Sequence, residues 1–171
     1  MVETQFSLET ADAIINDSNL TTGGAYTSVG TYPTQEIVDL VSNLSLRSGT
    51  PVPDLLRHFG RHLFHRFAAV HPEFITNHAS VFALLCKLDD QIHIDVQKLY
   101  NDAELPSFEH EQLSMNSMLF IYHSRRAMPD LAHGLIEGCI AYFGQTMQIE
   151  RVDLPSDKDG AHTRFTLTVE G

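Results

Sequence analysis

The sequence predicts an α+β fold, with a helical first part (about 1–105) and a second part of helix and sheet (about 106–171). Before Pro106, apolar residues recur every three or four positions, which is typical of amphipathic helices. After Pro106, short segments alternate apolar and polar residues, as strands do. No low-complexity linker divides the 171 residues. We therefore expect one domain, residues 1–171, in which the helical part packs on a roughly four-stranded antiparallel sheet.

The first predicted helix covers residues 1–20, because its apolar side chains fall near one stripe. These side chains are Val2, Phe6, Ala13 and Ile14. No capping residue precedes Met1, so we expect related chains to begin earlier. Gly23 and Gly24 break the chain after this helix.

Three more helices are predicted in the first part. One covers 35–47 and ends at Gly49. The next starts near Pro51, continues to about Ala69 and is closed by the His71-Pro72 pair. The helix over about 79–100 has the clearest helical spacing. Its apolar positions are Val81, Leu85, Leu88, Ile92, Val96 and Leu99. A loop follows at Asn101-Asp102.

The second part alternates strand and helix patterns. Residues 114–123 are predicted as a strand, and 130–143 as a helix with one apolar side. Two further strands are predicted over 147–154 and 163–169, joined by a hairpin turn at 156–160. The sheet is therefore expected to be antiparallel.

Composition argues against several classes of function. The 11 basic and 22 acidic side chains give a net charge of −11, which disfavours nucleic acid and anionic membranes as partners. No apolar run approaches the roughly 18 residues of a membrane span, and no secretory signal is visible. Cys86 and Cys139 form no metal-binding pattern, so we expect free thiols and a cytoplasmic location.

His93 is the first candidate site residue. One interpretation is a partly exposed histidine that is hydrogen-bonded to Asp89 or Asp90, four and three positions earlier on the helix. The other is an axial haem ligand, with Nε2 on the iron and Nδ1 held by an acceptor. Periodicity alone does not choose between them.

The stretch Tyr122-His123-Ser124-Arg125-Arg126 is the second candidate. On a strand, Tyr122, Ser124 and Arg126 would point to one face and present a phenol, a hydroxyl and a guanidinium. Such a set suits an anion with several oxygens, for example the two carboxylates of a porphyrin. The alternative is an ordinary solvated strand end.

A third candidate is the helical face that carries His58, His62 and His65. Spacings of four and three residues could place them around Zn²⁺ or another divalent ion, as in a small metal-dependent hydrolase. The alternative is a solvated basic face, because three arginines lie nearby and oppose cation binding. They are Arg57, Arg61 and Arg66. No nucleophile elbow, phosphate loop or paired-carboxylate pattern appears. We expect no enzymatic activity, with the small hydrolase as the alternative.

Several segments together resemble the haem-nitric oxide/oxygen binding (H-NOX) family of bacterial gas sensors, which includes the haem domain of soluble guanylate cyclase. The matching segments are Gly24-Ala25-Tyr26-Thr27-Ser28-Val29-Gly30-Thr31-Tyr32-Pro33, Val52-Pro53-Asp54-Leu55-Leu56, Phe59-Gly60-Arg61, Ile92-His93, Lys98-Leu99-Tyr100, Leu105-Pro106, Tyr122-x-Ser124-x-Arg126 and Gly134-Leu135-Ile136-Glu137-Gly138. The resemblance spans nearly the whole chain and keeps its spacing, which makes it more specific than any single motif.

The resemblance implies haem b (iron protoporphyrin IX), held between the two parts of the domain. His93 would be the proximal iron ligand. Tyr122, Ser124 and Arg126 would hold the propionates, and Pro106 would press on the porphyrin. Nitric oxide (NO) would release His93 from the iron, and the change would be reported to a separate protein, a histidine kinase or a cyclic-di-GMP enzyme.

The distal side departs from the oxygen-binding members. They carry a tyrosine five residues after the motif's arginine, where this chain has Leu131, and a second distal polar position corresponds to Leu63. O₂ on iron is helped by a hydrogen-bond donor and NO needs far less help, so apolar residues here favour NO. An oxygen sensor is the alternative. Relatives also have about ten more residues ahead of Met1, and some carry a C-terminal zinc-binding cysteine cluster that is absent from this sequence.

Overall fold

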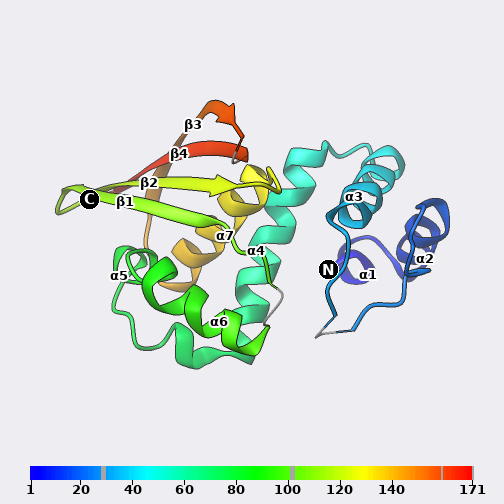
Figure 1. Cartoon of the computed structure of the whole chain (residues 1–171), viewed down its shortest axis with the longest axis horizontal. Coiled ribbons are helices and arrows are strands. Elements are labelled where there is room, and N and C mark those ends of the chain that lie inside the picture. Colours follow the sequence, from blue (N-terminus) through cyan, green and yellow to red (C-terminus); the bar gives the residue numbers. More distant parts are fainter. Residues whose placement is uncertain (28–29, 101–102, 159, 171) are drawn as a thin grey trace.

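The protein has the predicted α+β architecture (Figure 1). The computed structural model describes residues 1–27, 30–100, 103–158 and 160–170. Helices α1 to α3 lie at one end of the molecule, and the sheet lies at the other with α5 and α6 beside it (Figure 1). The long helix α4 (Val52–Val70) connects the two ends. Within the described residues, no helix combines the length and the apolar character that a membrane crossing needs.

The first predicted helix is in fact two, α1 (Val2–Gln5) and α2 (Leu8–Asp17). Ser7 has extended backbone angles and interrupts the helix between them. Its hydroxyl accepts the backbone N–H of Thr10 at 3.1 Å and so caps α2. The apolar stripe continues across this break, which is why spacing alone predicts one helix.

Helix α3 (Thr34–Ser48) anchors the loop that precedes it through the buried Glu36. The Glu36 carboxylate accepts hydrogen bonds from the hydroxyls of Thr21 at 2.5 Å, Thr22 at 2.9 Å and Tyr26 at 2.8 Å. This network fixes the segment that carries the family-like Tyr26–Pro33 sequence, of which Ser28 and Val29 lie outside the described residues. Gly49 ends α3 in the left-handed conformation, as expected.

Helices α4 and α7 (Pro129–Tyr142) pack closely, because glycines line their contact. A Cβ atom at Gly60 would overlap the carbonyl oxygen of Leu131, and one at Gly134 would overlap the carbonyl of Arg57. Side chains also join the two helices: Arg57 and Arg61 of α4 form ion pairs with Glu137 of α7. Burial raises the pKa of Glu137, but hydrogen bonds from Arg57 and Arg61 outweigh it, so that the pKa lies below its usual value.

The predicted helix over 79–100 is divided into three pieces. These are α5 (Val81–Leu85), a π-helical turn (Leu88–Ile92) and α6 (His93–Leu99). In the π turn, the N–H of Ile92 donates to the carbonyl of Lys87, five residues back, at 3.0 Å. The extra residue in this turn lets the chain stay helical while it changes direction before His93. The loop predicted at Asn101-Asp102 lies outside the described residues.

The four antiparallel strands have the order β1-β2-β4-β3. They are β1 (Ser107–Ser114), β2 (Ser117–Ser124), β3 (Met147–Asp157) and β4 (Gly160–Val169). The sequence pattern misses β1, because it is an edge strand on which only Phe108 is partly buried. The predicted strand 114–123 therefore begins too early, at the last residue of β1, and includes the turn between β1 and β2. The hairpin turn is shorter than predicted, since β3 reaches Asp157 and β4 resumes at Gly160; Asp159 lies outside the described residues.

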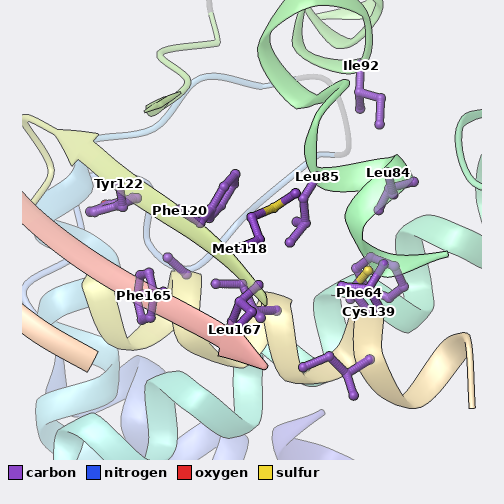
Figure 2. Packing of buried hydrophobic residues seen from close by; sticks show 14 of the residues in the cluster. Phe64, Leu84, Leu85, Ile92, Met118, Phe120, Tyr122, Cys139, Phe165 and Leu167 are labelled. Atoms are coloured by element: carbon purple, nitrogen blue, oxygen red, sulfur yellow. The ribbon is translucent and has the colours of Figure 1, made fainter. Parts of the chain in front are cut away.

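The main core lies between the sheet and the helices. Alternate residues of β2 and β4 are buried, among them Met118, Phe120, Phe165 and Leu167. Figure 2 shows Met118 and Phe120 on the side of β2 that faces Leu85. Both cysteines are free thiols, and burial raises the pKa of Cys139 to about 12.

Candidate functional site

An apolar cavity of about 280 Å³ lies between the helical part and the sheet. Helices α4 and α7, the α5–α6 segment, and strands β1 and β2 all contribute to its wall. Apart from His93 and the thiol of Cys139, the lining side chains are hydrocarbon. They include Leu63, Phe67, Leu84, Leu88, Val96, Pro106, Phe108, Phe120 and Leu135. A cavity of this character suits a flat, largely apolar ligand.

His93 brings one imidazole to this cavity. It is the first residue of α6, directly after the π turn, and its side chain is 17% exposed. Nδ1 lies 2.9 Å from Oδ1 of Asp89, and the ring packs against Phe108 with centroids 5.6 Å apart. The histidine thus has the predicted acidic neighbour on one side and lines the cavity on the other, so the two interpretations of His93 are compatible.

The tyrosine, serine and arginine of the second candidate do not share one strand face. Tyr122 and Ser124 lie in β2, but the strand ends at Ser124 and Arg126 sits in the turn beyond it. Ser124 shapes this turn, because its hydroxyl accepts the backbone N–H of Arg126 at 3.2 Å. Tyr122 is buried, at 3% exposure, and its hydroxyl oxygen accepts the N–H of Met128 at 3.2 Å. The tyrosine O–H therefore stays available as a donor.

A second, polar hollow of about 460 Å³ adjoins the apolar cavity. Ser124, Arg125 and Arg126 line it, and Leu105 lines both spaces. Nε of Arg126 lies 3.5 Å from Oε2 of Glu104, and its side chain is 38% exposed. A guanidinium at the mouth of an apolar cavity can take a carboxylate of a ligand whose body lies inside.

These residues fit a haem. The cavity offers apolar surface for a porphyrin ring and one imidazole for its iron, and the hollow offers a guanidinium and a hydroxyl for its carboxylates. The buried Oδ1 of Asp89 makes no hydrogen bond of normal geometry among the described residues, although Nδ1 of His93 is nearby. Such an acceptor is what an iron-bound histidine needs behind it.

The comparisons with known proteins agree with this geometry. The family model for haem-NO-binding proteins matches residues 1–151. The chain belongs to this family, the H-NOX proteins. No protein among those of curated function matches it significantly.

Solved H-NOX structures share the fold over almost the whole chain. The Fe(II) unliganded H-NOX protein from K. algicida is 33% identical with a TM-score of 0.89, covering 99% of this chain and 91% of that one. The H-NOX from Shewanella woodyi, bound to IWP-051 in the Fe(II)CO state, is 38% identical with a TM-score of 0.81, covering 98% and 87%. An S. oneidensis H-NOX protein in the Fe(II)NO state, at 24% identity and a TM-score of 0.88, has the same fold over 100% and 94%.

The two leucines expected on the distal side of this H-NOX chain have different positions. Leu63 lines the apolar cavity, as does Pro106. Leu131 is not among the cavity-lining residues of the described chain, and its carbonyl oxygen faces Gly60 in the contact between α4 and α7. Leu135, one helical turn later, lines the cavity instead.

The histidine face of α4 does not form a metal site within the described residues. No group of three or more histidine, cysteine or acidic side chains there could hold an ion. His58 instead contacts Arg61, with Nδ1 2.9 Å from Nη2. The contact with Arg61 is the kind that the basic-face interpretation predicts, and the hydrolase alternative finds no three-ligand group among the described residues.

Asp89 has a role that sequence reasoning missed. The sequence pattern indicates Asp89 only as a partner of His93, but its Oδ2 also accepts the backbone N–H of Phe108 at 2.6 Å. Because β1 was not recognised as a strand, no sequence signal connected Asp89 to the sheet.

Proposed function

We propose that this H-NOX chain binds haem b in the apolar cavity, with His93 as axial ligand, and senses nitric oxide. The observation that carries the proposal is one imidazole in an otherwise apolar cavity that adjoins an arginine-bearing hollow. Ferrous haem would supply an iron that binds diatomic gases and takes one axial imidazole. Two similar H-NOX proteins were solved in the Fe(II) unliganded and Fe(II)CO states, which supports the same cofactor here.

The chain's own residues would hold the haem both at its iron and at its propionates. His93 would bind through Nε2, and Pro106 and Leu63 would contact the ring from the cavity wall. Arg126 would exchange its ion pair with Glu104 for a propionate, since the pair is partly exposed and long at 3.5 Å. The hydroxyls of Ser124 and Tyr122 would add neutral hydrogen bonds, which complete the set of three propionate residues.

The cavity wall supports NO rather than O₂ as the signal. O₂ on haem is stabilised by a hydrogen-bond donor on the distal side, whereas NO depends on one much less. Leu63 and Leu135 offer no donor, and Leu131 stands at the family's donor position with a hydrocarbon side chain. The Cys139 thiol is a weak donor. The oxygen-sensor alternative would need a donor that these side chains lack.

The proposed signal is release of His93 when NO binds. Without its restraint at Nε2, His93 would be free to shift with α6, and the helical part would move relative to the sheet. The ligand can change the output only by its preference for one state, and a hundredfold effect needs about 2.7 kcal/mol. We expect a separate partner to receive the signal in the bacterial cytoplasm, a histidine kinase or a cyclic-di-GMP enzyme, with no catalysis by this chain itself.

The visible absorption spectrum of the reduced, haem-loaded protein tests this function. We expect a Soret band under argon, no stable complex in air and a shifted band under NO. A stable complex with O₂ in air would contradict the selectivity for NO. A protein that stays colourless after haem is added would reject the haem sensor altogether and indicate a module that kept the fold without the cofactor.

A further inference from the structure

We propose that Asp89 is a positioning residue that holds His93 and ties it to strand β1. One carboxylate oxygen would accept a hydrogen bond from Nδ1–H of His93, while the other accepts the backbone N–H of Phe108. This inference rests on the proposed function in one respect, that Nε2 of His93 binds the haem iron.

The carboxylate lies between two donors from different elements. Oδ2 accepts the backbone N–H of Phe108 at 2.6 Å, and Oδ1 lies 2.9 Å from Nδ1 of His93. Oδ1 is buried and makes no hydrogen bond of normal geometry within the described residues. A buried carboxylate oxygen without a partner is unfavourable. A small rotation of the imidazole would align its N–H with Oδ1 and satisfy that oxygen.

If Nε2 of His93 binds the iron, the imidazole tautomer would favour this arrangement. A neutral imidazole has one N–H, so a ring that binds metal through Nε2 carries its proton on Nδ1. That N–H then points to Asp89, and an anionic acceptor makes the imidazole a stronger electron donor to the metal. An amide at position 89 has one acceptor oxygen in place of two, so it could not serve both donors from the same position.

The location of Asp89 makes it a direct link between the helical part and the sheet. It lies in the π turn that leads into His93, and Phe108 is in the edge strand β1. The bond covers a backbone N–H that an edge strand would otherwise leave unpaired. Phe108 also contacts the His93 ring and stacks on Phe120 of β2 at 4.6 Å. A shift of His93 would therefore act on β1 through both the Asp89 carboxylate and the Phe108 ring.

The variant Asp89→Ala tests the link, with Asp90→Ala as the matched control. Asp90 is exposed in the same π turn and makes no hydrogen bond or ion pair within the described part of the chain. In Asp89→Ala, we expect the iron–histidine stretching frequency of the reduced protein to fall in resonance Raman spectra. We also expect hydrogen exchange at the Phe108 amide of the haem-free protein to become about 10- to 100-fold faster, since a bond to a charged acceptor is lost.

Asp89→Asn, which keeps the side-chain shape, provides a second test if the alanine variant folds poorly. Its stretching frequency should also fall, because the acceptor is no longer an anion. An unchanged frequency in both variants, or unchanged exchange at Phe108 in Asp89→Ala, would overturn the two-sided role. If neither the unmodified protein nor the variants take up haem, the proposed function fails, and the exchange rate at Phe108 still decides whether Asp89 holds β1.

Discussion

At the scale of single residues, Arg126 is the side chain on which we expect haem retention through the carboxylates to depend most. Its present partner, Glu104, is exposed and 3.5 Å away, so a propionate can replace it at low cost. In Arg126→Ala, we expect haem to transfer to apomyoglobin about tenfold faster, in line with loss of one charge-assisted contact. Arg126→Lys keeps the charge but not the planar fork, and should be intermediate. Retention unchanged in Arg126→Ala would remove the propionate assignment.

Glu36 gives a second residue-scale prediction, which concerns acid stability. The hydrogen bond from Thr21, with further bonds from Tyr26 and Thr22, lowers the pKa of Glu36 from 4.5 to about 2, against the effect of desolvation. Because the folded pKa is depressed, its stabilisation is complete above about pH 4.5 and is lost as the pH falls towards 2.

We therefore expect Glu36→Gln to lower the melting temperature at pH 7 and to reduce the loss of stability between pH 4.5 and 2. Asp39→Asn on the same helix is the control and should change little, because Asp39 is only partly buried and its one side-chain partner is Gln35. Thermal melts followed by circular dichroism across this pH range measure both effects. Equal acid profiles for Glu36→Gln and the unmodified protein would show that the network does not hold the carboxylate ionised.

The family resemblance, rather than spacing along one element, groups residues that line the cavity. His93, Pro106 and Leu63 all line it, and their contacts with haem stay predictions. Spacing on a strand placed Arg126 wrongly, because the turn after Ser124 is set by a local side-chain bond that periodicity does not contain. Leu131 is not among the cavity-lining residues of the described chain for a similar reason: the glycine contact with α4 fixes how α7 is rotated.

Contact between α4 and α7 gives a prediction at the scale of elements. A methyl group at Gly134 would overlap the carbonyl of Arg57, so one helix must move. We expect Gly134→Ala to destabilise the protein by about 1–3 kcal/mol, the usual cost of overpacking. Elsewhere in a helix interior the same change would stabilise by up to about 1 kcal/mol. Denaturant unfolding therefore tests the sign, and a more stable variant would contradict the close contact.

Elements were predictable where apolar spacing was continuous and faced the core. Helices α3, α4 and α7 and strands β3 and β4 follow that rule. Apolar spacing does not predict two breaks in the helices. Ser7 and the π turn interrupt the regular helical hydrogen bonds without interrupting the apolar pattern. Strand β1 was missed for the opposite reason: it is a polar edge strand with almost no buried face.

The whole molecule places its candidate site where the helical part meets the sheet. Side chains from both parts line the apolar cavity, so a change at His93 is in contact with each of them. The cavity cannot be predicted from the sequence pattern of either part alone. Its shape depends on how the π turn, the α4–α7 contact and the edge strand β1 come together. The periodicity of apolar residues predicts none of these three features.

Binding of the iron by His93 is the central claim, and a haem titration of His93→Gly tests it most directly. The absorption spectrum of the reduced variant is recorded with and without added imidazole, beside the unmodified protein. We predict that the variant retains little haem alone and recovers it when imidazole fills the place of the missing side chain. A variant that holds haem as tightly as the unmodified protein, with the same spectrum and no response to imidazole, would contradict the account.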